Sequence, residues 1–489
     1  MDGPTRTDPS ATPGPGRLRP PPDLPRALGD LRASGWKSVP VAEEMRRNAA
    51  ALIATGGSIT PGVLGFEDSV VPQLENAILA GHDIILLGER GQAKTRVVRS
   101  LVGLLDEWLP VVAGSEINDD PYSPISRACI NLVEEMGDAT PVDWVHRSQR
   151  YGEKLATPDT SIADLIGEVD PIKIAEGRYL SDELALHYGL IPRVNRGIFA
   201  INELPDLSER IQVGLLNVLE ERDVQIRGHR IRLPLDITLV ATANPEDYTN
   251  RGRIITPLKD RFGAQIRTHY PYETMTEVAI MESEAELPTA GMPVVVPSFL
   301  KEVVAEVSQL ARRSTHLNQR SGVSVRLSIA NYETLVANAV RRALRTGETL
   351  AVPRVSDLAA LVPSTQGKIE VEAMEEGHES DVVAHLVAAA TLAVFRRRVT
   401  LEDPGAIVAA FAEHVVVHAG DDLPSDAYLA VLADIPELEP PTRALAGPEG
   451  AESPALMASA LEFLLEGLHL TKRLNKDASG ARALYRGRK

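Results

Sequence analysis

The stretch HDIILLGERGQAKTRVVRS, residues 82–100, decides the fold. Its apolar run 84–87 is typical of a strand that is buried on both faces of a parallel sheet. A glycine-containing loop, GERGQAKT (88–95), comes next, and the following residues have the pattern of a helix to about residue 106. Strand, glycine-containing loop, Lys-Thr and helix is the order of a phosphate-binding P-loop.

The loop predicts a site for the phosphates of ATP. Backbone N–H groups of the loop and of the helix N-terminus would point at the phosphates. Lys94 would reach the terminal phosphates, and the Thr95 hydroxyl would ligate Mg²⁺. The predicted nucleotide-binding residues are Gly88, Glu89, Arg90, Gly91, Gln92, Ala93, Lys94 and Thr95. Because Ala93 stands where the strict pattern has Gly, a plain turn with an incidental lysine is the alternative.

Two further apolar runs end in polar residues. GIFAIN (197–202) is followed by Glu203, and ITLVATA (237–243) is followed by Asn244. The carboxyl ends of parallel strands open onto one crevice, so these residues are expected beside the loop. Glu203 would orient or deprotonate an attacking water, and Asn244 would position that water.

Asn202 departs from the usual pattern of P-loop ATPases, in which an Asp at this position holds Mg²⁺ through water. An amide oxygen accepts a hydrogen bond from a metal-bound water but brings no negative charge. Asn202 is therefore a predicted metal-site residue of uncommon type. The structural alternative for Glu203 is a carboxylate satisfied by a helix N-terminus.

Two arginines are candidates for contact with the nucleotide. Arg261 would be an arginine finger presented to a neighbouring subunit, and its alternative is a salt bridge with Asp260 or a nearby Glu. Arg326 precedes a helical pattern and would reach the nucleotide from a small helical lid.

Charge and composition exclude some function classes. The 68 acidic and 51 basic residues give a net charge of −17, which argues against a general nucleic-acid binder. A basic hairpin is predicted at 223–233, flanked by Arg222; a solvated face is favoured over nucleic-acid contact because no aromatic residues interleave, and a pore-facing or partner-facing role stays open. The single cysteine, Cys129, fits a reducing compartment. No apolar run is long enough to span a bilayer, so a cytoplasmic protein without a membrane partner is expected.

The organisation of the chain follows from composition and periodicity. A surface insertion and a moving, partner-contacting loop are both open for 159–189. The predicted parts are a disordered Pro-rich tail (1–25), a helical segment (26–62), the α/β ATPase core (63–290), a helical lid (291–365), a further helical region (366–435), a Pro-rich linker (436–454), and a C-terminal helix with a basic tail (455–489).

Taken in order, GERGQAKT, NRGIFAINEL, LLNVLEER, VATANP, LKDRF and SVR make the chain resemble AAA+ ATPases of the group that holds MoxR-type proteins and the ATPase subunit of magnesium chelatase. The similarity covers about residues 60–343. The resemblance implies an α/β fold, with an αβα P-loop AAA+ core, a parallel sheet, an all-helical lid and further C-terminal helices. It also implies ATP and Mg²⁺ bound between the identical subunits of a ring, usually a hexamer.

The resemblance also implies roles for single residues. Walker A would be Lys94 and Thr95, Walker B would be Asn202 and Glu203, sensor 1 would be Asn244, the arginine finger would be Arg261, and sensor 2 would be Arg326. The hairpin at 223–233 and the stretch 164–183 fall where this group carries insertions. Relatives often work with a von Willebrand type A partner. The Asp-x-Ser-x-Ser motif of that partner is absent from this sequence, so the partner would be a separate chain.

The predicted function is ATP hydrolysis in a ring that remodels a partner protein or inserts a metal or cofactor into it. The alternative, which Asn202 motivates, is a nucleotide-gated binding module with slow or no hydrolysis. A transcription activator of the enhancer-binding AAA+ type is not supported, because neither its Gly-Ala-Phe-Thr-Gly-Ala loop nor a C-terminal helix-turn-helix is found.

Overall fold

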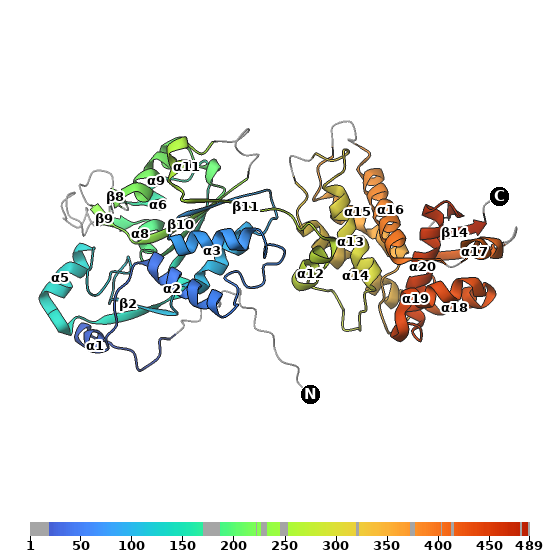
Figure 1. Cartoon of the computed structure of the whole chain (residues 1–489), viewed down its shortest axis with the longest axis horizontal. Helices are drawn as coiled ribbons and strands as arrows, with labels where there is room; N and C mark the ends of the chain where they lie inside the picture. Colours follow the sequence, from blue (N-terminus) through green and yellow to red (C-terminus); the bar gives the residue numbers. More distant parts are fainter. Residues whose placement is uncertain are drawn as a thin grey trace. The chain divides into compact units, whose positions relative to one another are not determined.

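The computed structural model describes residues 19–169, 186–221, 223–225, 232–244, 253–318, 322–371, 377–401, 403–411, 415–479 and 482–487 (Figure 1). The chain divides into two compact units, Met1–His269 and Tyr270–Lys489. The division between the two units lies about 20 residues before residue 290, where the sequence predicts the boundary between core and lid. Residues 1–18 of the expected Pro-rich tail lie outside the described part.

A five-stranded sheet forms the centre of the first unit. Its order is β11-β1-β10-β7-β4, and all neighbouring strands run parallel. The strands are β1 (Ile84–Leu87), β4 (Tyr151–Leu155), β7 (Gly197–Asn202), β10 (Ile237–Ala243) and β11 (Ala264–Arg267). Every residue of β1 and β10 is buried, as their continuous apolar runs predict. The three strands on which the sequence prediction rests are thus neighbours.

Helices cover both faces of this sheet. Ile84 and Leu86 of β1 join the core that α2 (Val41–Ala54), α3 (Val70–Ala80) and α4 (Lys94–Ser100) cover. Ile85 and Leu87, whose side chains point the other way, join the opposite core with α6 (Ile162–Leu165), α8 (Leu190–Arg193), α9 (Glu209–Glu221) and α11 (Thr256–Arg261). This confirms the predicted αβα core.

Smaller elements of the first unit surround the sheet. They are α1 (Leu28–Ala33), η1 (Leu101–Leu104), β2 (Trp108–Val112), α5 (Arg127–Met136), η2 (Gly137–Ala139), β3 (Val142–His146), η3 (Arg147–Gln149), β5 (Gly167–Val169), β6 (Leu186–Tyr188), η5 (Leu204–Asp206), β8 (Asp223–Gln225) and β9 (Arg232–Pro234). The sequence showed only an irregular pattern between residues 112 and 162, where α5, β3 and β4 lie.

The N-terminal helical segment is part of the first unit. Arg150, which follows η3, donates from both terminal nitrogens to the Glu44 carboxylate on α2, at 2.7 and 2.6 Å. Both side chains are buried. The backbone N–H of Val41 donates to Asp236, just before β10, at 2.8 Å. These bonds join α2 to the residues that precede β4 and β10. Removal of either Glu44 or Arg150 would leave the other charge buried without a partner, which is strongly destabilising.

The second unit is mainly helical. Its elements are α12 (Thr274–Glu284), α13 (Ser298–Ala311), α14 (Arg326–Thr346), η7 (Val355–Ala360), α15 (Leu361–Gln366), α16 (Glu379–Arg398), α17 (Pro404–Ala410), β12 (Val416–Gly420), α18 (Ser425–Asp434), η9 (Pro436–Leu438), α19 (Glu439–Gly450), α20 (Pro454–Leu470), β13 (Leu474–Ser479) and β14 (Arg482–Gly487). Helix α20 is buried for most of its length. None of the helices in the described ranges has the length and apolar composition needed to cross a membrane.

Three segments of this unit differ from the sequence expectation. The expected Pro-rich linker is largely helical. Helix α19 is kinked at Gly447, whose φ and ψ are 75° and 171°, and Pro440 stands in its first turn, where a missing N–H has no intrahelical partner to lose. The expected basic tail forms β14, which lies between β12 and β13 in an antiparallel sheet and buries Tyr485. The helical region expected at 366–435 also contains the strand β12.

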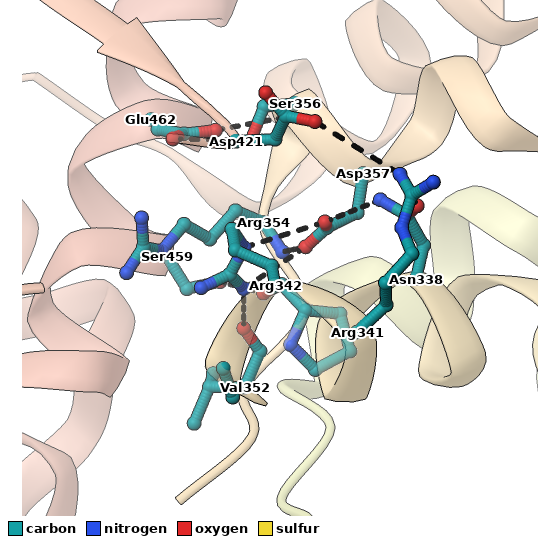
Figure 2. A network of polar contacts seen from close by, with 12 residues as sticks. Asn338, Arg341, Arg342, Val352, Arg354, Ser356, Asp357, Asp421, Ser459 and Glu462 are labelled. Carbon is teal, nitrogen blue, oxygen red and sulfur yellow. Dashed lines mark hydrogen bonds and ion pairs between the residues drawn. The ribbon is translucent and has the colours of Figure 1, made fainter. Parts of the chain in front are cut away.

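A buried polar network connects α14, η7 and α20 in the second unit (Figure 2). The carboxylate of Asp357 accepts hydrogen bonds from Arg342 at 3.0 Å, from Asn338 at 2.7 Å and from the backbone N–H of Arg354 at 2.8 Å. The neighbouring Ser356 donates its backbone N–H to Glu462 on α20 at 2.8 Å. The Asp357 and Glu462 carboxylates are thus paired inside the protein, and these pairs fix how the three elements pack.

The carboxyl of Glu462 predicts a pH dependence of stability. Burial raises its pKa above the ordinary 4.5, although the Arg354 guanidinium opposes the shift. The folded state then keeps a proton that the unfolded chain releases, so this contribution to stability is lost as pH rises from about 4.5 toward the raised value. We predict that Glu462→Gln loses less melting temperature between about pH 5 and about pH 7 than the wild type does.

Differential scanning calorimetry of the full chain measures this difference, with Glu437→Gln, at an exposed position, as the control. Equal losses in the wild type and Glu462→Gln would contradict the prediction.

Candidate nucleotide-binding site

The glycine-containing loop joins β1 to α4 through two left-handed residues. The φ angles of Gly91 and Ala93 are 73° and 52°, and α4 begins at Lys94. A left-handed conformation costs a non-glycine residue roughly 1–2 kcal/mol. The strain therefore falls on Ala93, at the position where the strict motif has Gly. Strain of this kind persists where the surrounding structure imposes it, which is common at functional sites.

Gly88 lies where no side chain fits. A Cβ atom added there would stand 1.9 Å from Thr268 Oγ1 and 2.2 Å from Gln92 Oε1. These two atoms are themselves bonded, because the Thr268 hydroxyl donates to Gln92 at 2.7 Å, and the backbone N–H of Thr268 donates to the carbonyl of Leu87 at 2.8 Å. The start of the loop is thus held against the segment that follows β11.

Lys94 and Asn244, which the sequence places after different strands, meet in the structure. Both side chains are buried. The Lys94 ammonium donates to Asn244 Oδ1 at 2.7 Å, to the carbonyl of Glu89 at 2.8 Å and to the carbonyl of Gly88. The ammonium is therefore surrounded by oxygen acceptors at the ends of β1 and β10.

Asn202 and Glu203 lie at the end of the next strand, β7. The Thr242 hydroxyl on β10 donates to Asn202 Oδ1 at 3.3 Å and accepts from the backbone N–H of Glu203 at 3.2 Å. Glu203 is left-handed, with φ of 56°, so a second strained residue stands at the strand ends. These bonds tie the end of β7 to β10.

The remaining predicted residues are on α4, in the loop before it, and on α11 and α14. Thr95 is the second residue of α4 and is half-buried, whereas Arg90 is exposed in the loop. Arg261 is the last residue of α11 and is exposed. Arg326 begins α14, in the second unit, and is also exposed. All other predicted site residues belong to the first unit.

Parts of both expected insertions are described. Strands β8 and β9 pair antiparallel, as a hairpin at 223–233 requires. Its turn, with Arg227 and Arg230, and the flanking Arg222 lie outside the described residues. The same holds for 170–185 of the other insertion, whose flanking strands β5 and β6 also pair antiparallel.

The sequence prediction missed Glu153, on the edge strand β4. Its carboxylate accepts hydrogen bonds from Asn202 Nδ2 at 2.5 Å, Arg99 Nε at 2.9 Å and the Tyr151 hydroxyl at 3.0 Å. Burial acts to raise the pKa of Glu153, but the hydrogen bonds from Arg99, Tyr151 and Asn202 more than offset it, so the pKa lies below its usual value. The signal in the sequence was weak: Tyr151 and Glu153 share one face at period two, without an apolar run.

The part of the chain that the structure describes contains no group of three or more His, Cys, Asp or Glu side chains that could hold a metal ion. Mg²⁺ is usually held by one or two protein ligands together with waters and phosphate oxygens, so it does not require a cluster of this kind.

Parts of the sequence are similar to known proteins. The family model of the Sigma-54 interaction domain matches residues 176–261. Magnesium-chelatase subunit ChlI of Nostoc sp. is 27% identical over 258 residues, which cover 51% of this chain and 63% of that protein. Magnesium-chelatase subunit ChlI-2 of Arabidopsis thaliana is 30% identical over 216 residues, covering 41% of this chain and 46% of that protein. The chain thus spans about half to two thirds of the length of these relatives.

Solved structures give weaker likenesses. A chain in the complex between subunits BchI and BchD of magnesium chelatase is 23% identical, with a TM-score of 0.35, and the match covers 65% of this chain and 97% of that chain. A putative ATPase from Cytophaga hutchinsonii is 15% identical, with a TM-score of 0.29, and the match covers 73% and 97%.

A parallel αβα sheet with a lysine-bearing loop after β1 and polar residues at the ends of β7 and β10 defines the class of P-loop nucleotide-binding domains. Within this class, the sequence matches are to the Sigma-54 interaction domain and to magnesium-chelatase subunits. The chain is similar to AAA+ ATPases of the magnesium-chelatase ATPase-subunit group, as its motifs predict.

The close packing around Gly88 gives a test of the loop. We predict that Gly88→Ala destabilises the chain by roughly 1–3 kcal/mol, as overpacking does elsewhere, because the added methyl group meets Thr268 and Gln92. Gly103→Ala is the matched control, since a Cβ there has nothing within 4 Å. Urea denaturation followed by circular dichroism measures both. Equal stability of Gly88→Ala and the wild type would contradict the loop packing described above.

Proposed function

We propose that the protein binds ATP with Mg²⁺ and hydrolyses it in a ring of identical subunits, in order to remodel a partner protein or to drive insertion of a metal or cofactor. The observation that carries this proposal is the contact between Lys94 and Asn244 at the ends of β1 and β10. It supports the proposal because a phosphate-binding ammonium and a water-positioning amide must face one ligand.

The residues present fit a Mg²⁺–triphosphate. The Lys94 ammonium already has three oxygen acceptors, and a phosphate oxygen is an acceptor of the same kind with more charge. Gly88 lets the loop pack tightly, and the Thr95 hydroxyl and the Asn202 amide oxygen are ligand types that Mg²⁺ accepts directly or through water.

Each residue has a part in the proposed reaction. Lys94 would bind the terminal phosphates, while Thr95 and, through water, Asn202 would hold Mg²⁺. When bound there, Mg²⁺ would supply positive charge that neutralises the phosphate oxygens. Glu203 would orient the attacking water and take its proton, and Asn244 would help to hold that water in place.

Two arginines would connect the site to its surroundings. Arg261 is exposed on α11, which suits an arginine finger presented to the next subunit. Arg326, at the start of α14, would act as sensor 2 from the helical part.

The ring is proposed as a hexamer, with a separate von Willebrand type A protein as partner. The names of the curated relatives, which are subunits of an enzyme, support an assembly of several chains. A cytoplasmic site of action belongs to the same proposal.

One alternative has its own observation. Asn202 replaces the usual acid, so the protein could instead be a nucleotide-gated binding module with slow or no hydrolysis. Turnover by the wild type decides between the two. The Sigma-54 match lies within the shared ATPase core, and the sequence lacks the Gly-Ala-Phe-Thr-Gly-Ala loop of such activators.

Substitution of Lys94 tests the proposal. We predict that Lys94→Ala lowers ATP turnover by about 100-fold or more, the typical loss when a group that stabilises transition-state charge is removed. Phosphate release measures this, and Lys37→Ala, at an exposed lysine outside the site, is the control. Equal turnover of Lys94→Ala and the wild type would remove Lys94 from the reaction.

Glu203→Gln separates binding from hydrolysis. We predict that this variant binds ATP with the affinity of the wild type, because the loop is unchanged, and that it loses turnover by about 10²–10⁴-fold, the usual contribution of a general base. Calorimetric titration measures the binding. Turnover like that of the wild type would show that Glu203 is not the base.

A further inference from the structure

A chain of hydrogen bonds crosses three neighbouring strands, β4, β7 and β10, beside the candidate site. Arg99, on α4, donates to Glu153, on β4, at 2.9 Å. Asn202, on β7, donates its amide N–H to Glu153 at 2.5 Å and accepts from Thr242, on β10, at 3.3 Å. Thr242 in turn accepts from the backbone N–H of Glu203. The helix that starts at Lys94 is thus connected to the strained backbone of Glu203.

The direction of the Asn202 amide is decided within this chain. A carboxamide has an acceptor oxygen and a donor nitrogen of nearly the same shape, so its neighbours determine which way it points. An ionised carboxylate only accepts hydrogen bonds, and a charge-assisted bond is roughly twice as strong as a neutral one. Glu153 therefore holds the nitrogen on the β4 side, and the oxygen faces Thr242 on the β10 side.

The β10 side is where the candidate site lies. Two residues after Thr242 stands Asn244, whose oxygen contacts the Lys94 ammonium. The amide oxygen of Asn202 is the only atom of its side chain that can accept a hydrogen bond from a metal-bound water. An amide turned the other way would present N–H groups, which neither bind a cation nor accept a hydrogen bond from metal-bound water.

We propose that Glu153 is a positioning residue for Asn202, which keeps the amide oxygen of Asn202 directed at the Mg²⁺–nucleotide site. The inference rests on the proposed function, because it concerns the same site. It explains how a carboxamide serves at a position where related proteins use a carboxylate: the required oxygen is oriented by an acid on the neighbouring strand.

Asn202→Asp restores the acid that P-loop ATPases usually have at this position, yet the proposal predicts that this substitution alone is unfavourable. Asn202→Asp alone would place a carboxylate oxygen against the Glu153 carboxylate, at a contact of 2.5 Å that now joins donor to acceptor. Two acceptors of like charge repel each other at that distance. Adding Glu153→Gln to Asn202→Asp would restore a donor opposite an acceptor, with the two roles exchanged between the strands.

The test is a double-mutant cycle in the full chain, with the wild type, Asn202→Asp, Glu153→Gln and the double variant. Glu107→Gln is the control, since it removes the same charge at an exposed position of the first unit. Two quantities are measured: the melting temperature without nucleotide, and the affinity for a fluorescent ATP analogue in the presence of Mg²⁺ and, separately, of EDTA. The comparison with EDTA isolates the part of the affinity that depends on Mg²⁺.

We expect Glu153→Gln to lower the Mg²⁺-dependent affinity by about 10-fold to 100-fold, as loss of an outer-shell partner does at metal sites, and to leave the affinity in EDTA unchanged. Asn202→Asp should lower the melting temperature and the Mg²⁺-dependent affinity, and the double variant should recover both. Recovery separates positioning from a purely structural effect of either substitution.

Two results would overturn the proposal. In the first, the wild type binds the Mg²⁺–nucleotide and Glu153→Gln binds it equally well; the proposed function then stands and this inference alone fails. In the second, the double variant is no better than Asn202→Asp, which would show that the two side chains do not act as a pair. A wild type that binds no nucleotide at all would contradict the proposed function itself, and with it the role of Glu153.

Discussion

The parallel pairing of β1 with β10 is the constraint on which the candidate site depends. Its register sets Leu87 beside Ala243, so both strands end at the same level. The backbone N–H of Gly88 donates to the carbonyl of Ala243 at 3.1 Å, and the loop starts directly beside the end of β10. From this starting point the Lys94 ammonium lies within 2.7 Å of Asn244 Oδ1. A shift of one residue in this register would move the two groups apart and turn each side chain to the other face.

The strand ends also hold backbone strain in place. Ala93 and Glu203 are both left-handed, and neither is a glycine. Neighbouring strands supply the contacts that oppose this strain, including the bond from the backbone N–H of Glu203 to Thr242. The bond between Glu153 and Asn202 extends the same support to the edge strand β4. Hydrogen bonds across the sheet therefore support both the left-handed backbone of Glu203 and the orientation of the Asn202 side chain.

The central strands could be predicted from the sequence, and the edge strand could not. Strands buried on both faces read as continuous apolar runs, which is why Ile84–Leu87 and Ile237–Ala243 were recognised with the residues that follow them. Strand β4 is at the edge of the sheet, where it pairs with β7, and its sequence mixes polar and apolar residues. No continuous apolar run therefore indicated a strand at Glu153. The C-terminal strand β14 was missed for a similar reason, since Arg482 and Arg486 flank Leu484 and the buried Tyr485 and give the stretch the composition of a basic tail. Proline content was misleading at α19, because a proline in the first turn of a helix is tolerated.

A structure of the chain with Mg²⁺ and a non-hydrolysable ATP analogue tests the central claim most directly. The account predicts a terminal phosphate oxygen at hydrogen-bond distance, about 3 Å, from Lys94 Nζ, with Glu203 and Asn244 facing the same phosphate from the ends of β7 and β10. A nucleotide bound elsewhere on the chain, or bound without contact to Lys94, would contradict the account.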